Sequence, residues 1–218
     1  MKIGIFDSGI GGLTVLKELV QSSPNNYYIY YGDVTRAPYG DKPPEVIATY
    51  AKEIAASFVE QGVDLIVVAC NTVSAVAMVE LRTNCPVRVI GMVEPVLEHM
   101  ATTNYKRVGV VATAATISSG VYQTGLGNQG KQVVAVACPE LVPLIEAGNF
   151  GPELTAAIQL RFGEFIGQNI QALILACTHY PIIQDKIENF FQHANEKIQI
   201  INPALLLDAD VIIKRDQN

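Results

Sequence analysis

Two cysteines at the ends of apolar runs are the residues of this chain best suited to acid–base chemistry. Cys70 closes the run LIVVAC at 65–70, Cys177 closes the run LILAC at 173–177, and polar residues follow each of them. Runs of this kind are typical of buried strands in a parallel sheet. Open α/β sheets bind their ligands at the carboxyl ends of such strands. The sequence therefore predicts two thiols at ligand-binding sheet edges.

The two thiols suit two kinds of reaction. One thiol beside polar groups would serve as a nucleophile, as in an amidase or a thioester enzyme. Two thiols on opposite walls of one cleft would invert a carbon centre, because one removes a proton from one face while the other delivers a proton to the opposite face. The ordinary pKa of a thiol, ~8.5, needs only modest tuning for this work. Neighbouring acids and His179 would then set which thiol is deprotonated.

Polar side chains near the predicted strand ends are candidates to assist the thiols or to bind a ligand. Thr72 and Thr178 could hydrogen-bond a carboxylate or an amine. His179 could polarise or protonate a neighbour, and Asp7 or Glu146 could take up a proton. The chemistry would then be carried by side chains that lie far apart in the chain.

The segment DSGIGG at 7–12 joins the first predicted strand to a helix. Its glycines permit a tight turn, and the free backbone N–H groups of such a turn suit an anion such as a carboxylate. The pattern is neither GxGxxG nor GxxxxGK[ST], so nucleotide binding has weak support. Asp7 and Ser8 are equally well placed to cap the helix. The segment ATAATISSG at 112–120 leaves the same two alternatives, ligand binding and helix capping.

The two cysteine segments belong to a longer repeat. KIGIFDS at 2–8 precedes the first segment, and RVGVVAT at 107–113 precedes the second. Gly4 and Gly109 are 105 positions apart, and Cys70 and Cys177 are 107 apart, which indicates a duplicated α/β unit. The two halves should face each other and bring both thiols to one cleft.

Strands and helices alternate throughout, which predicts two pseudo-symmetric, doubly wound and mostly parallel α/β domains. We expect residues 1–95 with 204–218 to form the first domain and residues 96–203 to form the second. The predicted strands are 2–7, 27–32, a run up to Cys70, 86–90, 107–111, 132–137, a run up to Cys177, and 198–201. The predicted helices include 13–19, 44–61, one from about 74, 153–168, one from about 180, and one after 203.

Composition narrows the class of protein. Half of the 218 residues are hydrophobic, 17% are charged, and the net charge is −6 without a basic cluster. This balance favours a compact globular protein and argues against a nucleic-acid partner. No apolar run reaches membrane-spanning length, no signal peptide is visible, and the four cysteines are widely spaced, so we expect a cytoplasmic protein with free thiols. The three scattered histidines lack ligand spacing, so we expect no metal site.

Seven stretches of the chain together resemble the glutamate racemases of the aspartate/glutamate racemase superfamily. They run over nearly the whole chain in the order typical of that family. The stretches are IGIFDSGIGGLTVL at 3–16, YYGDVTRAPYG at 30–40, VVACNTVSA at 67–75, GMVEP at 91–95, VGVVATAATI at 108–117, CPELVPLIEAG at 138–148 and ACTHYPII at 176–183.

The resemblance implies a cofactor-independent interconversion of L- and D-glutamate, the latter used in bacterial peptidoglycan. It implies that Cys70 acts on D-glutamate and Cys177 on L-glutamate, and that Asp7, His179 and Glu146 assist them. The positions that it places around the substrate are Asp7, Ser8, Tyr39, Gly40, Asn71, Thr72, Thr113, Thr116 and Thr178. The small-molecule substrate is the expected partner; a homodimer is left open.

Two other classes of function stay open. One is a different enzyme of the same fold, such as an aspartate or hydantoin racemase. Aspartate racemases resemble this chain but tend to carry Glu at the position of His179, which favours glutamate as the substrate. The other is a non-catalytic regulatory relative that kept the cleft. The intact cysteine pair argues against this second alternative.

Overall fold

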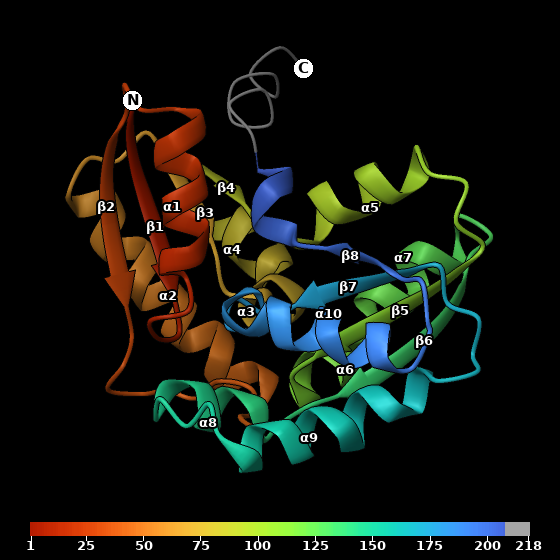
Figure 1. The fold of residues 1–218 in the computed structure, drawn as a ribbon. Coiled ribbons are helices and arrows are strands. Elements are labelled where there is room, and N and C mark those ends of the chain that lie inside the picture. The colour runs from red at the N-terminus through yellow and green to blue at the C-terminus, as the bar shows by residue number, and fades with distance from the viewer. Residues whose placement is uncertain (208–218) are drawn as a thin grey trace.

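The fold consists of two four-stranded parallel sheets, each covered by helices (Figure 1). A computed structural model of the chain describes residues 1–207. The first sheet has the order β2-β1-β3-β4 and the second has the order β6-β5-β7-β8. The strands of the first sheet are β1 (Lys2–Asp7), β2 (Tyr27–Gly32), β3 (Leu65–Val68) and β4 (Arg88–Ile90). Those of the second sheet are β5 (Arg107–Ala112), β6 (Gln132–Ala137), β7 (Ala172–Ala176) and β8 (Gln199–Ile201). The α/β class and the two parallel sheets predicted from the sequence are confirmed.

Helices connect the parallel strands and lie on both faces of each sheet. The α-helices are α1 (Leu13–Ser22), α2 (Pro44–Glu60), α3 (Asn71–Val76), α4 (Met78–Asn84), α5 (Val93–Ala101), α6 (Ala114–Ser119), α7 (Val121–Gly127), α8 (Leu141–Glu146), α9 (Pro152–Phe162) and α10 (Gln184–His193). Three short 3₁₀ turns complete the described chain: η1 (Gly163–Phe165), η2 (Tyr180–Ile183) and η3 (Pro203–Leu206). None of the helices within residues 1–207 is both long enough and apolar enough to cross a membrane.

The first sheet buries alternate residues of its strands in two cores. Ile66 and Val68 of β3 pack with α2, α3 and α4, whereas Leu65 and Val67 pack with α1 and η3 on the opposite face. This alternation follows from the two-residue repeat of a strand. Because both faces are covered, β3 is apolar throughout, and the first polar residues come only after its end.

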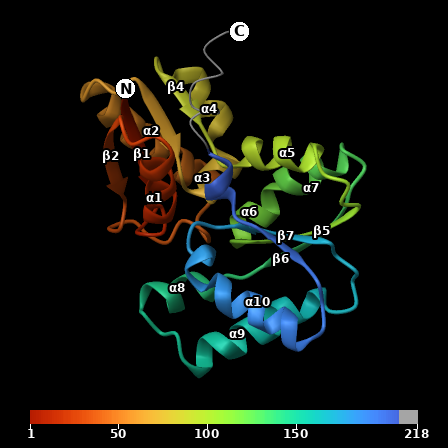
Figure 2. The ribbon, with the colours of Figure 1, turned by 45° about the horizontal axis from the view of Figure 1, so that its top comes forward.

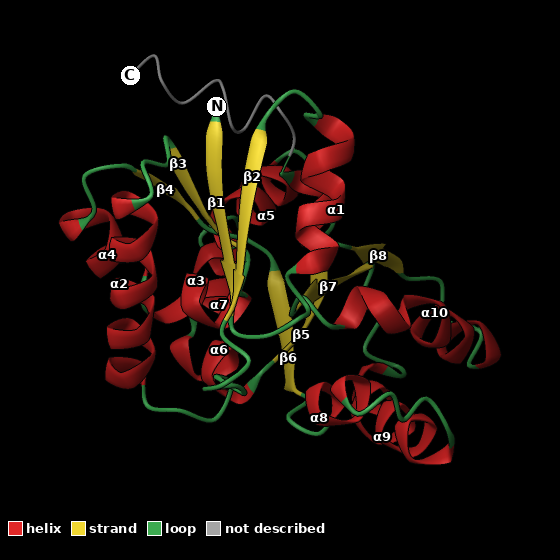
Figure 3. Cartoon of the chain, turned by 90° about the vertical axis from the view of Figure 1, so that its left-hand side faces the viewer, coloured by secondary structure: helices red, strands yellow, loops and turns green. Residues whose placement is uncertain are grey.

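The second sheet is built in the same way. Leu173 and Leu175 of β7 face a core made with α8, α9 and α10, and Ala172 and Ile174 face a core made with α5 and α7. Figure 2 shows α9 and α10 on one side of this sheet and α5 and α7 on the other. Helices α3 and α6 lie side by side where the halves of the chain meet (Figure 3).

The strand register shows that the two cysteines occupy equivalent places. Gly4 of β1 pairs with Ile66 of β3, and Gly109 of β5 pairs with Leu173 of β7. Each cysteine lies four positions beyond that partner, at 70 and at 177. The duplication predicted from the sequence therefore extends to the pairing of the strands.

The first of these glycines also has a packing role. A Cβ on Gly4 would lie 2.8 Å from the Phe58 ring, so the missing side chain lets this ring pack on the strand.

Several predicted boundaries are wrong for local reasons. The helix expected from about 74 begins at Asn71, directly after Cys70, because the turn after β3 is short. The helix expected over 153–168 ends at Phe162, and the 3₁₀ turn η1 and Gly167, with a positive φ of 72°, follow it. The helix expected from Tyr180 begins with the 3₁₀ turn η2.

The division into residues 1–95 with 204–218 and residues 96–203 stays a prediction. Helix α5 runs across its boundary, and Val93, Val96 and Met100 of this helix join the core of the second sheet. Ala204 and Leu207 pack in the core of the first sheet, as the return of the chain to the first half requires. Residues 208–218 of the expected last helix lie outside the described residues.

Candidate active site

A single pocket between the two halves collects most of the predicted site residues. It contains about 540 Å³ of space between atoms, its open mouth included. The turns after β1, β3, β5 and β7 supply its polar wall, as the rule for parallel sheets requires. The residues that line it are Ser8, Ala37, Pro38, Tyr39, Gly40, Asp41, Cys70, Asn71, Thr72, Thr113, Pro139, Val142, Pro143, Glu146, Cys177, Thr178 and His179.

Cys70 lies at the end of β3, at the position that caps α3. Its side chain is buried, and its Sγ donates to the Ser8 Oγ at 3.6 Å. Burial raises the pKa of the Cys70 thiol to about 11, and the negative charge of Asp7 adds to this rise. The backbone N–H of Val73 opposes the rise, because it favours the thiolate. Cys70 is therefore a thiol at neutral pH.

Cys177 lies at the end of β7 beside a histidine–carboxylate pair. Its Sγ is 3.8 Å from Nδ1 of His179, and Nε2 of His179 is 2.9 Å from the Glu146 Oε1. A carboxylate accepts from Nε2–H, which leaves Nδ1 as the acceptor that faces the thiol. Burial raises the pKa of Cys177 well above its ordinary range, and the charges of Asp7 and Cys70 act in the same direction. Cys177 therefore has a proton to give and a base beside it.

Asp7 lies behind the pocket wall, where it is fully buried. Its carboxylate accepts from the backbone N–H of Gly9 at 3.0 Å and from the Thr178 hydroxyl at 3.2 Å. Burial raises the pKa of Asp7, whereas the nearby His179 and these hydrogen bonds lower it. Because the Thr178 proton points to Asp7, the hydroxyl oxygen of Thr178 is left as an acceptor for the pocket. Asp7 is thus placed to orient groups that touch a ligand, and it is not itself among the lining residues.

Three threonine hydroxyls join the two halves at the base of the pocket. Oγ1 of Thr72 is 2.9 Å from Oγ1 of Thr113, which is 2.9 Å from Oγ1 of Thr116. Thr113 also caps α6, since its hydroxyl accepts from the backbone N–H of Thr116. Thr72 and Thr113 line the pocket, but Thr116 is fully buried behind them. Thr116 thus lies one layer behind the lining residues, and its place beside the substrate stays a prediction.

The loop after β2 forms the opposite wall and brings Tyr39 and Gly40 to the pocket. The Tyr39 hydroxyl donates to the Asp33 carboxylate, which also accepts from Arg36 at 2.6 Å. A second hydrogen bond of 2.5 Å joins Arg36 to Glu53 of α2. The carbonyl of Gly40 accepts from Ala115 across the interface at 2.9 Å. This loop is therefore held by both halves of the chain.

Other residues of the wall were not singled out from the sequence. Pro139, Val142 and Pro143 precede or begin α8 and give the pocket an apolar side. They lie within the segment CPELVPLIEAG, but their side chains carry no acid–base chemistry, so residue type gave no signal. Ala37, Pro38 and Asp41 come from the loop after β2.

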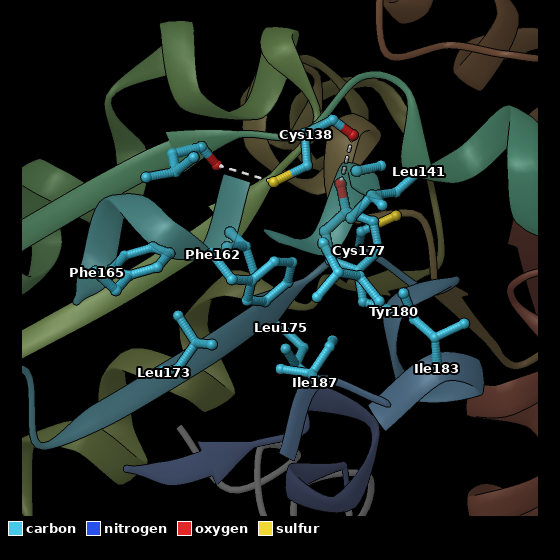
Figure 4. Packing of buried hydrophobic residues seen from close by; sticks show 14 of the residues in the cluster. Cys138, Leu141, Phe162, Phe165, Leu173, Leu175, Cys177, Tyr180, Ile183 and Ile187 are labelled. Carbon is cyan, nitrogen blue, oxygen red and sulfur yellow. Dashed lines mark hydrogen bonds between the residues drawn. The ribbon is translucent and has the colours of Figure 1, made fainter. Parts of the chain in front are cut away.

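The remaining cysteines, Cys85 and Cys138, do not line this pocket. Cys138 is fully buried among the apolar residues of the second half, and its Sγ is 3.9 Å from the Val136 carbonyl (Figure 4). The Tyr180 hydroxyl donates to the Cys138 carbonyl at 3.1 Å, which joins this core to the turn after Cys177. Cys138 thus packs beneath the site.

A methyl group on Gly11 is expected to disturb the site. The added Cβ would lie 2.5 Å from the Thr178 Oγ1 and 2.6 Å from Nδ1 of His179, so Gly11→Ala must displace both. We expect a fall in kcat/KM of at least about tenfold, since misplacement of catalytic groups by 1 Å is costly. The control is Gly163→Ala, where no atom lies within 4 Å of the added Cβ. Equal kcat/KM of the two variants, measured with the substrate that the resemblance implies, would contradict this close packing.

Known proteins of one family are similar to this chain. The family model described as Asp/Glu/Hydantoin racemase matches residues 3–207. A glutamate racemase of Aquifex aeolicus is 45% identical over 196 residues, which cover 89% of this chain and 77% of that protein. Crystal structures of glutamate racemases from Francisella tularensis, in complex with D-glutamate, and from Campylobacter jejuni have TM-scores of 0.86 and 0.89 at 36% and 34% identity. The matched regions cover 94% and 100% of this chain, and 76% and 86% of the Francisella and Campylobacter chains, respectively.

Proposed function

The chain belongs to the Asp/Glu/Hydantoin racemase family, and we propose that it is a glutamate racemase that uses Cys70 and Cys177 as its two bases. The observation that carries this proposal is the pair of thiols at equivalent strand ends, both lining one pocket. The identities to glutamate racemases favour glutamate over the other substrates of the family.

In the proposed reaction, the thiolate of Cys70 removes the α-proton of D-glutamate. The electron pair left on the α-carbon then takes a proton from the Cys177 thiol on the opposite face, which gives L-glutamate and a Cys177 thiolate. The reverse reaction exchanges the two roles. Two residues of one type suit this reaction, because its two directions are chemically equivalent.

Because the pKa of both thiols is raised, we propose that the bound substrate helps to deprotonate the thiol that acts as the base. An opposite charge within about 4–6 Å favours the charged form of a group. The ammonium group of glutamate, bound near Cys70, would therefore lower the pKa of this thiol from about 11. The thiolate then forms chiefly when there is a substrate to deprotonate.

His179 and Glu146 are proposed to serve Cys177. Nδ1 of His179 faces the Cys177 thiol, and Glu146, about a third exposed, bonds the other ring nitrogen. A proton taken up by Cys177 can pass to His179, and Glu146 stabilises the imidazolium that results. The group that bonds the Cys70 thiol is the Ser8 hydroxyl, whereas the group beside the Cys177 thiol is His179, so the two thiols are assisted by different groups.

The function is tested by following the α-proton of D- and L-glutamate in heavy water without added cofactor. We expect exchange and racemisation of both enantiomers and little turnover of aspartate. The preparation should be treated with a chelator beforehand, and neither added metal nor pyridoxal phosphate should raise the rate. Comparable rates on aspartate, or a reversible loss of activity with the chelator, would overturn the proposal.

The rate should rise with pH. The two thiols titrate as a pair, and the active form carries one proton between them. Because the pKa of Cys70 is raised to about 11 and that of Cys177 is raised further, this form is scarce at neutral pH and grows as pH rises. We expect kcat/KM to rise by up to about tenfold per pH unit from about pH 6.5 to 8.5.

The pH profile must be the same for both enantiomers, because the equilibrium constant of a racemisation is one. Measured rates on D- and L-glutamate over this range would check both points. A flat profile would show that one thiol of the pair is already ionised near neutral pH and would contradict the raised pKa of both thiols.

We further propose that the protein works in the cytoplasm and supplies D-glutamate for peptidoglycan. The four free thiols support a reducing compartment. Glutamate is the proposed small-molecule partner.

A further inference from the structure

Tyr122 of α7 connects the second half of the chain to the residue beside Cys70. Its side chain is fully buried, and its hydroxyl donates to Oδ1 of Asn71 at 2.8 Å. Burial raises the pKa of Tyr122, so the hydroxyl keeps its proton and remains a donor. A buried hydroxyl without a partner is unfavourable, which makes this bond between residues 51 positions apart a strong constraint on Asn71.

The bond decides which end of the Asn71 amide faces the pocket. A carboxamide has one acceptor oxygen and one donor nitrogen, and the oxygen of Asn71 is occupied by Tyr122. Within residues 1–207, no acceptor is hydrogen-bonded to Nδ2 of Asn71. Since Asn71 lines the pocket, its two N–H donors are left for a ligand. Donors at this place suit a carboxylate and disfavour an ammonium group.

We infer that Tyr122 is a positioning residue that holds Asn71 with its amide donors toward a carboxylate of the substrate. This role deepens the glutamate racemase function proposed above and rests on it. Without the hydroxyl, the Asn71 amide can turn over and present its oxygen to the same carboxylate. Tyr122 would then act on substrate binding through Asn71 alone, since it does not itself line the pocket.

The test combines Tyr122→Phe with Asn71→Ala in a double-mutant cycle. Phenylalanine keeps the ring and its packing, so the fold is retained, as circular dichroism can verify. We expect Tyr122→Phe to raise the KM for glutamate by about tenfold and to change kcat by less than about threefold, since the lost contact is made in both ground and transition states. In the Asn71→Ala background, Tyr122→Phe should have no further effect on kcat/KM.

The control is Tyr28→Phe, which removes a hydroxyl that donates to the Leu19 and Ser23 carbonyls, away from the pocket. It should leave KM unchanged. Losses in kcat/KM that multiply in the double variant, or a fall in kcat at constant KM, would overturn the role of Tyr122. An unmodified protein without activity on glutamate would instead overturn the proposed function, so the two failures are distinguishable.

Discussion

Replacing either Cys70 or Cys177 with serine is expected to reduce racemisation of both glutamate enantiomers by roughly 10³–10⁴-fold. Serine preserves the size of the side chain, but a hydroxyl is a far weaker base than a thiol. Both directions suffer, because each needs one residue as base and the other as acid. The measurement is the rate of change of optical rotation, starting from each enantiomer in turn.

The single variants should still differ in a reaction that needs only one base. Elimination of a good leaving group from a β-substituted glutamate requires removal of the α-proton and no delivery to the other face. Cys70→Ser should retain elimination from the L-isomer through Cys177, and Cys177→Ser should retain it from the D-isomer through Cys70. If both variants retained elimination from the same isomer, or both lost it, the thiols would not act on opposite faces.

The other two cysteines supply the controls. Cys138→Ser and Cys85→Ser change the same atom outside the pocket, so racemisation should remain nearly normal. Cys138→Ser buries a hydroxyl in an apolar core and is expected to cost about 1–3 kcal/mol of stability. A fall in the melting temperature with unchanged kcat would separate packing from chemistry at this position.

Replacing His179 with asparagine is expected to lower kcat/KM by about 10²–10³-fold. Asparagine keeps a polar group near the Cys177 thiol but cannot exchange a proton with it, and the contact between Nε2 and Glu146 is lost. The fall must be equal for D- and L-glutamate, since the equilibrium constant does not change. Steady-state kinetics from both enantiomers would measure it.

The elimination reaction shows on which side His179 acts. Elimination from the L-isomer, which uses Cys177, should fall with racemisation, whereas elimination from the D-isomer through Cys70 should be affected less. The matched variant Glu146→Gln keeps the size of the partner and removes its charge, so we expect a smaller loss of about tenfold on the same side. Equal losses for both isomers would contradict an assignment of His179 to Cys177.

Local patterns were enough to predict the framework of this protein. Apolar runs that end at Cys70 and Cys177 predicted two buried strands, and the nearly equal offsets of the cysteine pair and of the pair Gly4 and Gly109 predicted the duplication. These inferences succeeded because a parallel strand covered on both faces must be apolar along its whole length. Helix ends were less predictable, since the limit of α9 near Gly163 depends on how the following turn packs.

The α/β class, the repeat and the two thiols could thus be inferred from the residues alone. The packing of the two halves was needed to show that Thr72 and Thr113 touch the pocket while Thr116 lies behind them, and that Tyr122 bonds Asn71. The difference lies in the range of the interactions. A strand pattern reflects neighbours two residues apart, but these hydrogen bonds join α3 to α6 and α7 and exist only once the two sheets have packed together.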